Sequence, residues 1–362
     1  MAAVRPEIIY IEKEVAELPY TQTILQKFSG VQTKIIADLR ALIRQNKKTI
    51  FIKQNQPLVL ARQRGRFLEK CPGTKEHICC NYHTLNIAVG CPYDCTYCFL
   101  QSYSNNPYYT IYVNLDEMLA EIRGKVKGRI RLGTGEFTDS LALETQTRFV
   151  HTYAPQICAI SPDITLELKT KSAPLCPADI SPWQGETSLH LQKQLVFSWS
   201  VNPQSLIDSD EHDAAPLRER IRAARTAAEY GYRVALHFDP IIYSADWAEK
   251  YQTVLDLIQQ NIPPEKIAWV SLGTFRFTPA LKPIIEQKFP ASTIVYGELF
   301  PGRDKKMRYP EPLRVKIYQH MLRQIAAISP HLPVYLCMES PEIWKKVYNQ
   351  LPAQAENLNE LF

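Results

Sequence analysis

Short apolar runs and helix-periodic segments alternate along most of the chain. From residue 83 onward the apolar runs are rich in β-branched residues, and they predict strands at 85–89, 130–133, 164–168, 195–201, 234–238, 267–272, 293–296 and 334–337. Between them, apolar positions at helical spacing predict helices near 115–127, 141–153, 216–230, 245–260, 279–288 and 311–328. One strand and one helix in each ~30 residues indicate βαβ units around a parallel sheet.

The order of these elements favours the α/β fold class. Repeated βα units without a glycine-rich nucleotide fingerprint indicate a complete or partial (β/α) barrel, which we place at residues 81–350. Residues 1–80 are predicted to form a helix-rich N-terminal region, because the apolar positions of 31–43 follow helical spacing. Short strands are expected there at 49–52 and 58–60, and residues 351–362 are expected to be a tail.

The composition is that of an ordinary globular protein. Of 362 residues, 45% are hydrophobic and 22% are charged, which supports a large core and excludes a disordered, collagen-like or coiled-coil chain. No apolar run approaches the ~18 residues of a membrane helix. The first residues lack a signal-like apolar stretch, so we expect a cytoplasmic protein with no membrane partner. The net charge of +5 permits a polyanionic partner without requiring one.

The nine cysteines are unevenly placed, and neither their number nor the chain length suggests a disulfide framework. Three are scattered and are expected to be small buried hydrophobes: Cys158, Cys176 and Cys337. The other six crowd together shortly before and after the first predicted strand of the barrel: Cys71, Cys79, Cys80, Cys91, Cys95 and Cys98.

The last three of these cysteines form a C-x3-C-x2-C loop, with Cys91, Cys95 and Cys98 as its thiols. Three closely spaced thiolates can hold three corners of a cubic iron–sulfur cluster and leave the fourth iron without a protein ligand. A structural zinc ion is the alternative, since a fourth ligand is available from His83 or Cys80.

Polar side chains follow every predicted strand from the second to the sixth. In a (β/α) barrel the chemistry gathers at these carboxyl ends, so their side chains are expected to line one ligand site. The residues in question are Glu136, Thr138 and Asp139, then Lys171, then Ser200 and Asn202, then Asp239, and finally Arg276 and Thr278.

The cysteine spacing after the first strand is the signature of radical S-adenosylmethionine enzymes. Further segments extend the likeness in order along the chain: 71–74, 97–101, 112–116, 170–171, 199–202 and 276–278, with Trp199-Ser200-Val201-Asn202 among them. Together they resemble the spore photoproduct lyase family over about residues 70 to 320. The resemblance implies a partial barrel of the radical S-adenosylmethionine type with a C-terminal basic hairpin.

The resemblance also implies two cofactors, a [4Fe-4S] cluster and S-adenosylmethionine. By matching motif, Cys91, Cys95 and Cys98 would bind the cluster. The polar groups of S-adenosylmethionine would contact Thr138, Lys171 and Ser200, and Glu136 suits its ammonium group. Asp139, Asn202 and Asp239 are expected at the ribose hydroxyls. A flavodoxin- or ferredoxin-type protein would donate the electron.

The family's reaction is the reversal of an ultraviolet-induced thymine dimer in DNA, a carbon–carbon bond cleavage begun by a 5′-deoxyadenosyl radical. In the family a thiol in the second strand-end loop then returns a hydrogen atom. This chain has no cysteine at 136–139, and Phe99 stands where a tyrosine is expected. Tyr97, Cys337 or the regenerated 5′-deoxyadenosine would supply the hydrogen, unless the substrate is another molecule, such as an RNA base or a peptide.

A basic segment near the C-terminus is the expected contact with nucleic acid. Residues 302–318 contain six basic and two acidic side chains with interleaved aromatics, a composition that suits phosphates and an unstacked base. It lies where the family places a DNA-contacting hairpin, and the residues selected there are Arg303, Lys305, Lys306, Arg308 and Tyr309. A second basic stretch lies at 62–70. A non-catalytic, metal-containing nucleic-acid-binding module is the remaining alternative.

Overall fold

The computed structural model describes residues 6–45, 57–73, 76–173 and 185–352. Its main element is a curled sheet of eight strands in the order β18-β14-β13-β11-β10-β9-β5-β4. From β5 to β18 all neighbours are parallel, and only the β4–β5 pair is antiparallel. These strands are β4 (Leu68–Lys70), β5 (Tyr82–Leu85), β9 (Ile130–Gly133), β10 (Ile164–Thr170), β11 (Leu195–Ser200), β13 (Arg233–Ile241), β14 (Ile267–Thr274) and β18 (Val334–Leu336).

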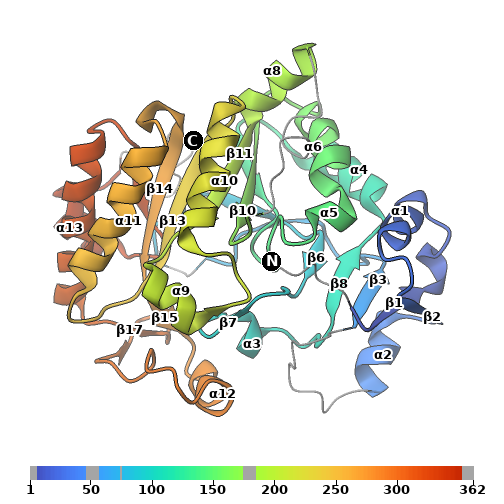
Figure 1. Cartoon of the computed structure of the whole chain (residues 1–362), viewed down its shortest axis with the longest axis horizontal. Coiled ribbons are helices and arrows are strands. Elements are labelled where there is room, and N and C mark those ends of the chain that lie inside the picture. The colour runs from blue at the N-terminus through green and yellow to red at the C-terminus, as the bar shows by residue number, and fades with distance from the viewer. Residues whose placement is uncertain (1–5, 46–56, 74–75, 174–184, 353–362) are drawn as a thin grey trace.

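Helices cover the outer face of this sheet, as Figure 1 shows for α6, α10, α11 and α13. The layer consists of α4 (Leu115–Lys125), α6 (Phe149–Cys158), α8 (Gly185–Gln194), α10 (Leu217–Glu229), α11 (Trp247–Asn261), α13 (Glu311–Ile328) and α14 (Pro341–Tyr348). Because helices pack outside and polar groups fill the inside, every residue of β11 and β14 is buried. The predicted partial (β/α) barrel is confirmed.

The arginines of α10 differ in burial, although they look alike in the sequence. Leu217, Ile221 and Ala228 face the sheet and are buried, as helical spacing predicts. Arg218 and Arg222 are exposed, but Arg220 is completely buried. The pattern alone did not distinguish it from its neighbours.

A smaller sheet packs beside the barrel and replaces the predicted helix-rich region. Its order is β2-β1-β3-β8-β6, formed by β1 (Ile8–Glu12), β2 (Gln32–Ile36), β3 (Leu58–Ala61), β6 (Ala88–Val89) and β8 (Tyr109–Tyr112). The helices α1 (Pro19–Lys27) and α2 (Leu39–Gln45) accompany it. Buried residues of the two sheets belong to one continuous hydrophobic cluster.

The helix predicted over 31–43 is wrong in its first half. Thr33, Ile35 and Ile36 are β-branched and favour β2, which pairs with β1 along its whole length. Asp38 then begins the helix: its carboxylate accepts a hydrogen bond from the Ala41 amide at 2.7 Å.

Two of the other strand predictions differ from the structure. The run at 85–89 divides between β5 and β6, which lie in different sheets. The strand predicted at 293–296 is wrong: Ile294 and Val295 are buried in a separate small cluster without entering a sheet. The strand predicted at 49–52 lies outside the described residues. The strand at 58–60 is confirmed as β3, and the predicted helices are present, with 141–153 divided into α5 (Glu144–Thr147) and α6.

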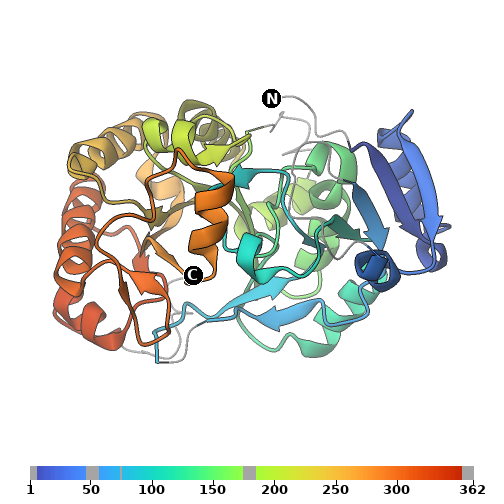
Figure 2. The same ribbon diagram turned by 90° about the horizontal axis from the view of Figure 1, so that it is seen from below.

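Two small antiparallel sheets lie at the carboxyl ends of the barrel strands. One joins β7 (Asp94–Cys95) to β12 (Glu211–His212), and the other joins β15 (Arg276–Phe277), β17 (Met307–Arg308) and β16 (Phe300–Pro301). Figure 2 looks onto this face, where α3 (Leu100–Tyr103) lies beside α12 (Leu281–Lys288). Within the described ranges, no helix has the length and apolar character that a bilayer span requires.

The tight packing of β14 gives a stability prediction. Leu272→Ala removes a completely buried side chain and should lower the free energy of unfolding by about 3 kcal/mol, because the barrel cannot collapse into the cavity. Leu189→Ala, at an exposed position of α8, should change it by less than ~0.5 kcal/mol. Denaturant titrations of both variants measure the difference, and equal effects would contradict the packing described here.

Candidate active site

The cysteine loop lies at the mouth of the barrel and is held by backbone hydrogen bonds. The Gly90 amide donates to the carbonyl of Phe137 at 2.9 Å, and Cys95 pairs with Glu211 across the β7–β12 ladder. Gly90 has φ +91°, and a Cβ atom there would approach the Tyr108 carbonyl to 3.3 Å, so the position requires glycine. The loop is therefore fixed independently of its cysteine side chains.

The three thiols of this loop suit a cubic cluster. None of the three forms a disulfide bond; Cys95 is buried, and Cys91 and Cys98 are partly exposed. Across the described part of the chain, no three His, Cys, Asp or Glu side chains converge closely enough to bind a single metal ion. The cysteine sulfurs that bind a cubic iron–sulfur cluster lie farther apart than those that bind one zinc ion. The absence of such a convergence among the described residues therefore argues against the zinc alternative and not against a cluster.

A buried carboxylate, Glu211, connects the cysteine loop to the ends of two barrel strands, β10 and β11, and to helix α10. Its Oε2 lies 2.6 Å from the guanidinium of Arg220, and its Oε1 accepts a hydrogen bond from the Asn202 amide at 2.8 Å. Tyr97 donates its hydroxyl to the same oxygen, and Lys171 Nζ lies 4.0 Å away. Burial alone would raise the pKa of Glu211, but the charges of Lys171 and Arg220 lower it to about 2.

This network brings together Tyr97, Lys171 and Asn202, three residues predicted from sequence. Lys171 Nζ also lies 5.6 Å from the centroid of the Tyr97 ring. Asn202 accepts a hydrogen bond from Tyr251 at 3.0 Å, so its amide is engaged on both sides. Ser200 is buried at the end of β11, and its carbonyl accepts from Arg220 at 3.0 Å.

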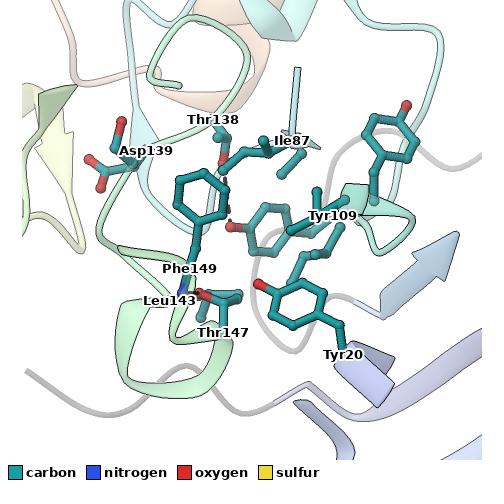
Figure 3. Close-up of a pocket in the computed structure, with 13 residues that line it drawn as sticks. Tyr20, Ile87, Tyr109, Thr138, Asp139, Leu143, Thr147 and Phe149 are labelled. Carbon is teal, nitrogen blue, oxygen red and sulfur yellow. Dashed lines mark hydrogen bonds between the residues drawn. The ribbon is translucent and has the colours of Figure 1, made fainter. Parts of the chain in front are cut away.

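The loop after β9 holds two more predicted residues. Asp139 accepts hydrogen bonds from Thr170 Oγ1 and from the Lys171 amide, both at 2.7 Å, so it organises the end of β10. Burial raises the pKa of this carboxyl. Thr138 donates to the Tyr109 hydroxyl at 3.3 Å, and Figure 3 shows the two side chains pointing toward one another at the wall of a small cavity.

A second group of charged side chains, here called the charged basin, consists of Glu136, Lys169, Asp239 and Arg276. Asp239 forms a two-pronged ion pair with Arg276 at 2.9 and 3.1 Å, and this guanidinium outweighs burial and lowers the pKa of Asp239 to about 2. Burial raises the pKa of Glu136 against the opposing charges of Lys169 and Arg276. Glu136 is partly exposed, which leaves its carboxylate accessible to a cationic ligand.

The predicted DNA-contacting hairpin exists, but only part of it faces solvent. Arg303 and Lys305 are exposed at the turn between β16 and β17, and Lys306 is partly exposed. Arg308 is buried, because its guanidinium pairs with Asp304 at 2.5 Å. Tyr309 is also buried, and its hydroxyl accepts from the Tyr243 amide at 3.1 Å. The structure therefore corrects the prediction for Arg308 and Tyr309, which build the hairpin instead of presenting it to DNA.

Comparisons with known proteins decide the family. A family model described as spore photoproduct lyase matches residues 4–139 and 186–326. The chain belongs to the spore photoproduct lyase family. Spore photoproduct lyase of Bacillus subtilis (strain 168) is 25% identical over 311 residues, covering 81% of this chain and 85% of the relative. That of Geobacillus sp. (strain Y412MC61) is 23% identical over 310 residues, with the same coverage.

Solved structures of spore photoproduct lyase share the fold. One with bound AdoMet and dinucleoside spore photoproduct aligns with a TM-score of 0.77 at 20% identity and covers 92% of this chain and 99% of that chain. Another, complexed with dinucleoside spore photoproduct, aligns with a TM-score of 0.76, also at 20% identity and the same coverage. The sequence resemblance and the radical S-adenosylmethionine type of partial barrel are both confirmed.

Two residues that organise the site, Glu211 and Arg220, were not predicted from the sequence. Glu211 follows the short helix α9 (Gln204–Asp210) and carries no motif. Arg220 looks like one more surface arginine of α10. The only sequence signal was the apolar neighbourhood of Arg220, since Ile221, Ala223 and Ala224 immediately follow it.

The buried ion pair gives a mutational prediction. Glu211→Gln leaves Arg220 buried without its counter-charge and should lower the free energy of unfolding by about 3 kcal/mol. Glu229→Gln breaks the exposed pair with Arg225 and should cost less than ~0.5 kcal/mol. Denaturant titration checks both, and a Glu211→Gln variant as stable as Glu229→Gln would refute the role assigned to the pair.

The same carboxylate predicts a pH dependence. The pKa of Glu211 is lowered from 4.5 to about 2, so its contribution to stability is complete above pH 4.5 and is lost as the pH falls toward 2. Stability measured between these two pH values should therefore decline less steeply in Glu211→Gln than in the unsubstituted protein. Parallel curves would show that the pKa of Glu211 is the same in the folded and unfolded states.

Proposed function

We propose that this chain is a radical S-adenosylmethionine lyase that reverses a pyrimidine photoproduct in DNA. The observation that carries the proposal is the trio of free thiols on a fixed loop at the mouth of a barrel of this family. Support comes from the curated relatives, which are both spore photoproduct lyases, and from the bound AdoMet and dinucleoside spore photoproduct of the structural relative.

In this proposal Cys91, Cys95 and Cys98 hold the [4Fe-4S] cluster. Bound together, the cluster and S-adenosylmethionine supply a 5′-deoxyadenosyl radical. Glu136 offers its open carboxylate to the ammonium group of S-adenosylmethionine, and Lys171 offers a cation at the opposite wall of the site.

The remaining predicted side chains act by positioning. Thr138 and Ser200 lie at the ends of β9 and β11, where they can contact the polar groups of the cofactor. Asp139, Asn202 and Asp239 already hold their neighbours through hydrogen bonds, so any contact with ribose would use their remaining lone pairs. Tyr97 keeps its hydroxyl on Glu211 and stays a predicted participant in hydrogen return.

The proposed partners are damaged DNA and a flavodoxin- or ferredoxin-type electron donor, in the cytoplasm. Arg303 and Lys305 are exposed in the turn between β16 and β17, and Lys306 is partly exposed beside them. Their charges would neutralise phosphates on either side of the lesion. A lesion must leave the duplex to reach the barrel mouth, so backbone contacts next to the opening are required.

The activity test begins with anaerobic reconstitution. The protein should take up iron and sulfide and produce 5′-deoxyadenosine when reduced, and nucleoside digests of irradiated oligonucleotides should show the dimer peak replaced by unlinked thymidine in chromatography. Cys95→Ala should abolish iron uptake and cleavage of S-adenosylmethionine, whereas Cys158→Ala, in a helix of the outer layer, should retain both. If S-adenosylmethionine is cleaved but no dimer is reversed, the DNA repair assignment is overturned, and an RNA base or a peptide is favoured as substrate.

The hairpin generates a separate binding prediction. Substituting Arg303 and Lys305 together by alanine should weaken binding to DNA and reduce the slope of log affinity against log salt by about 2, because two phosphate contacts are lost. The matched control substitutes Arg222 and Arg225 on the outer face of α10. Fluorescence anisotropy over a salt series measures both slopes, and an equal effect of the two pairs would remove the hairpin from the interface.

A further inference from the structure

Four cysteines outside the cluster loop form a thiol cluster within the barrel, and the proposed function has no use for three of them. Cys79 and Cys80 share a side-chain hydrogen bond. The Cys337 thiol interacts electrostatically with Cys71, Cys79 and Cys80, which places all four sulfurs in one neighbourhood. All four thiols are free.

The chain path explains how residues so far apart in sequence meet there. Residues 71–73 directly follow β4, and residues 76–81 directly precede β5. The Cys71 amide donates to the Tyr82 carbonyl at 2.9 Å, and the Ile78 amide donates to the Glu339 carbonyl at 3.0 Å. Glu339 lies just beyond β18, the strand at the opposite edge of the sheet, and Cys337 directly follows that strand.

Cys337 is the member of the cluster that faces the charged basin. Its backbone amide donates to the Leu272 carbonyl at 2.7 Å, which fixes it at the carboxyl end of β18. Its sulfur lies 3.5 Å from Arg276 Nη2 and forms a side-chain hydrogen bond with Asp239. A substrate in the basin would therefore meet Cys337 first.

The loop after β9 offers no thiol that could return the hydrogen atom in place of Cys337. Phe137 stacks on Tyr103 with ring centroids 5.9 Å apart, and Phe99 packs against both rings. Two of these three side chains are phenylalanines, which carry neither a thiol nor a phenol. The only phenol, that of Tyr103, belongs to a side chain that is 59% exposed and stands outside the basin.

We propose that Cys337 returns the hydrogen atom to the repaired base and that Cys80 and Cys79 reload it, an inference that rests on the proposed function. In the first step the S–H bond of Cys337 breaks homolytically while a C–H bond forms on the carbon radical of the product. Cys80 then gives its hydrogen atom to the Cys337 sulfur, and Cys79 gives its own to Cys80. Each of these two exchanges breaks one S–H bond and forms another. A small-molecule thiol in solution finally gives a hydrogen atom to Cys79 and leaves as a thiyl radical.

The protonation of these thiols agrees with those roles. Burial raises the pKa values of Cys71 and Cys337, and the hydrogen bond with Cys79 together with burial raises that of Cys80, so all three keep the hydrogen they would transfer. The hydrogen bond with Cys80 lowers the pKa of Cys79 to about 7. Cys79 is thus the most easily ionised of the four thiols and the first expected to react with an alkylating reagent.

The test compares single-turnover and multiple-turnover repair by reconstituted enzyme in deuterated water. The unsubstituted enzyme should place one deuterium in each repaired dimer. Cys337→Ala and Cys337→Ser should form 5′-deoxyadenosine normally but repair at least tenfold less, since the O–H bond of serine is too strong to donate. Cys80→Ala and Cys79→Ala should complete about one repair per enzyme and then stop, with Cys158→Ala as the matched control.

A second measurement does not depend on activity. Brief alkylation of the folded holoenzyme, followed by mass analysis, should label Cys79 before Cys337, Cys80 and the isolated Cys158. Labelling of Cys79 no faster than Cys158 would overturn its role in reloading. Repair that survives both substitutions of Cys337 overturns the inference alone, whereas absence of repair in the unsubstituted enzyme overturns the proposed function and the inference with it.

Discussion

The geometry of the site depends on one buried charge interaction, between Glu211 and Arg220. Both side chains are completely buried, and a carboxylate or guanidinium without a partner at such depth would be strongly destabilising. Because Glu211 also pairs with Cys95 through the backbone, the ion pair ties the cysteine loop to the helix layer outside the barrel. Tyr97, Lys171 and Asn202 then take their positions around a carboxylate that is already fixed.

The site has two charged walls with different consequences for a ligand. On one side the negative charge of Glu211 faces two cations, Arg220 and Lys171, which leaves an excess of positive charge there. On the other side Asp239 is paired with Arg276, and Glu136 beside this ion pair is partly exposed. A zwitterionic ligand such as the methionine part of the proposed cofactor suits this division, because each wall accepts one of its charges.

Much of the fold and the cluster loop could be predicted from sequence, because both depend on local patterns. Strand β9 begins and ends where its apolar run does, and three thiols spaced over eight residues lie on one loop in any compact structure. Features that depend on long-range packing could not be predicted. Arg220 shares its helix with exposed arginines, and only the distant Glu211 reveals that it is buried. From their residue types, Arg308 and Tyr309 were predicted to contact DNA. Their contacts with Asp304 and Tyr243 bury both side chains instead.

The order of strands in the small sheet has a consequence for how the chain can be divided. Strand β3 lies between β1 and β8, so segments from both sides of residue 80 pair with each other in one sheet. Removing the first 80 residues would strip β8 of its neighbour and expose apolar side chains that now pack in the common core. The N-terminal segment is therefore an integral part of the barrel's folding unit, and insertions or gene fusions would be better tolerated after α14 than near residue 80.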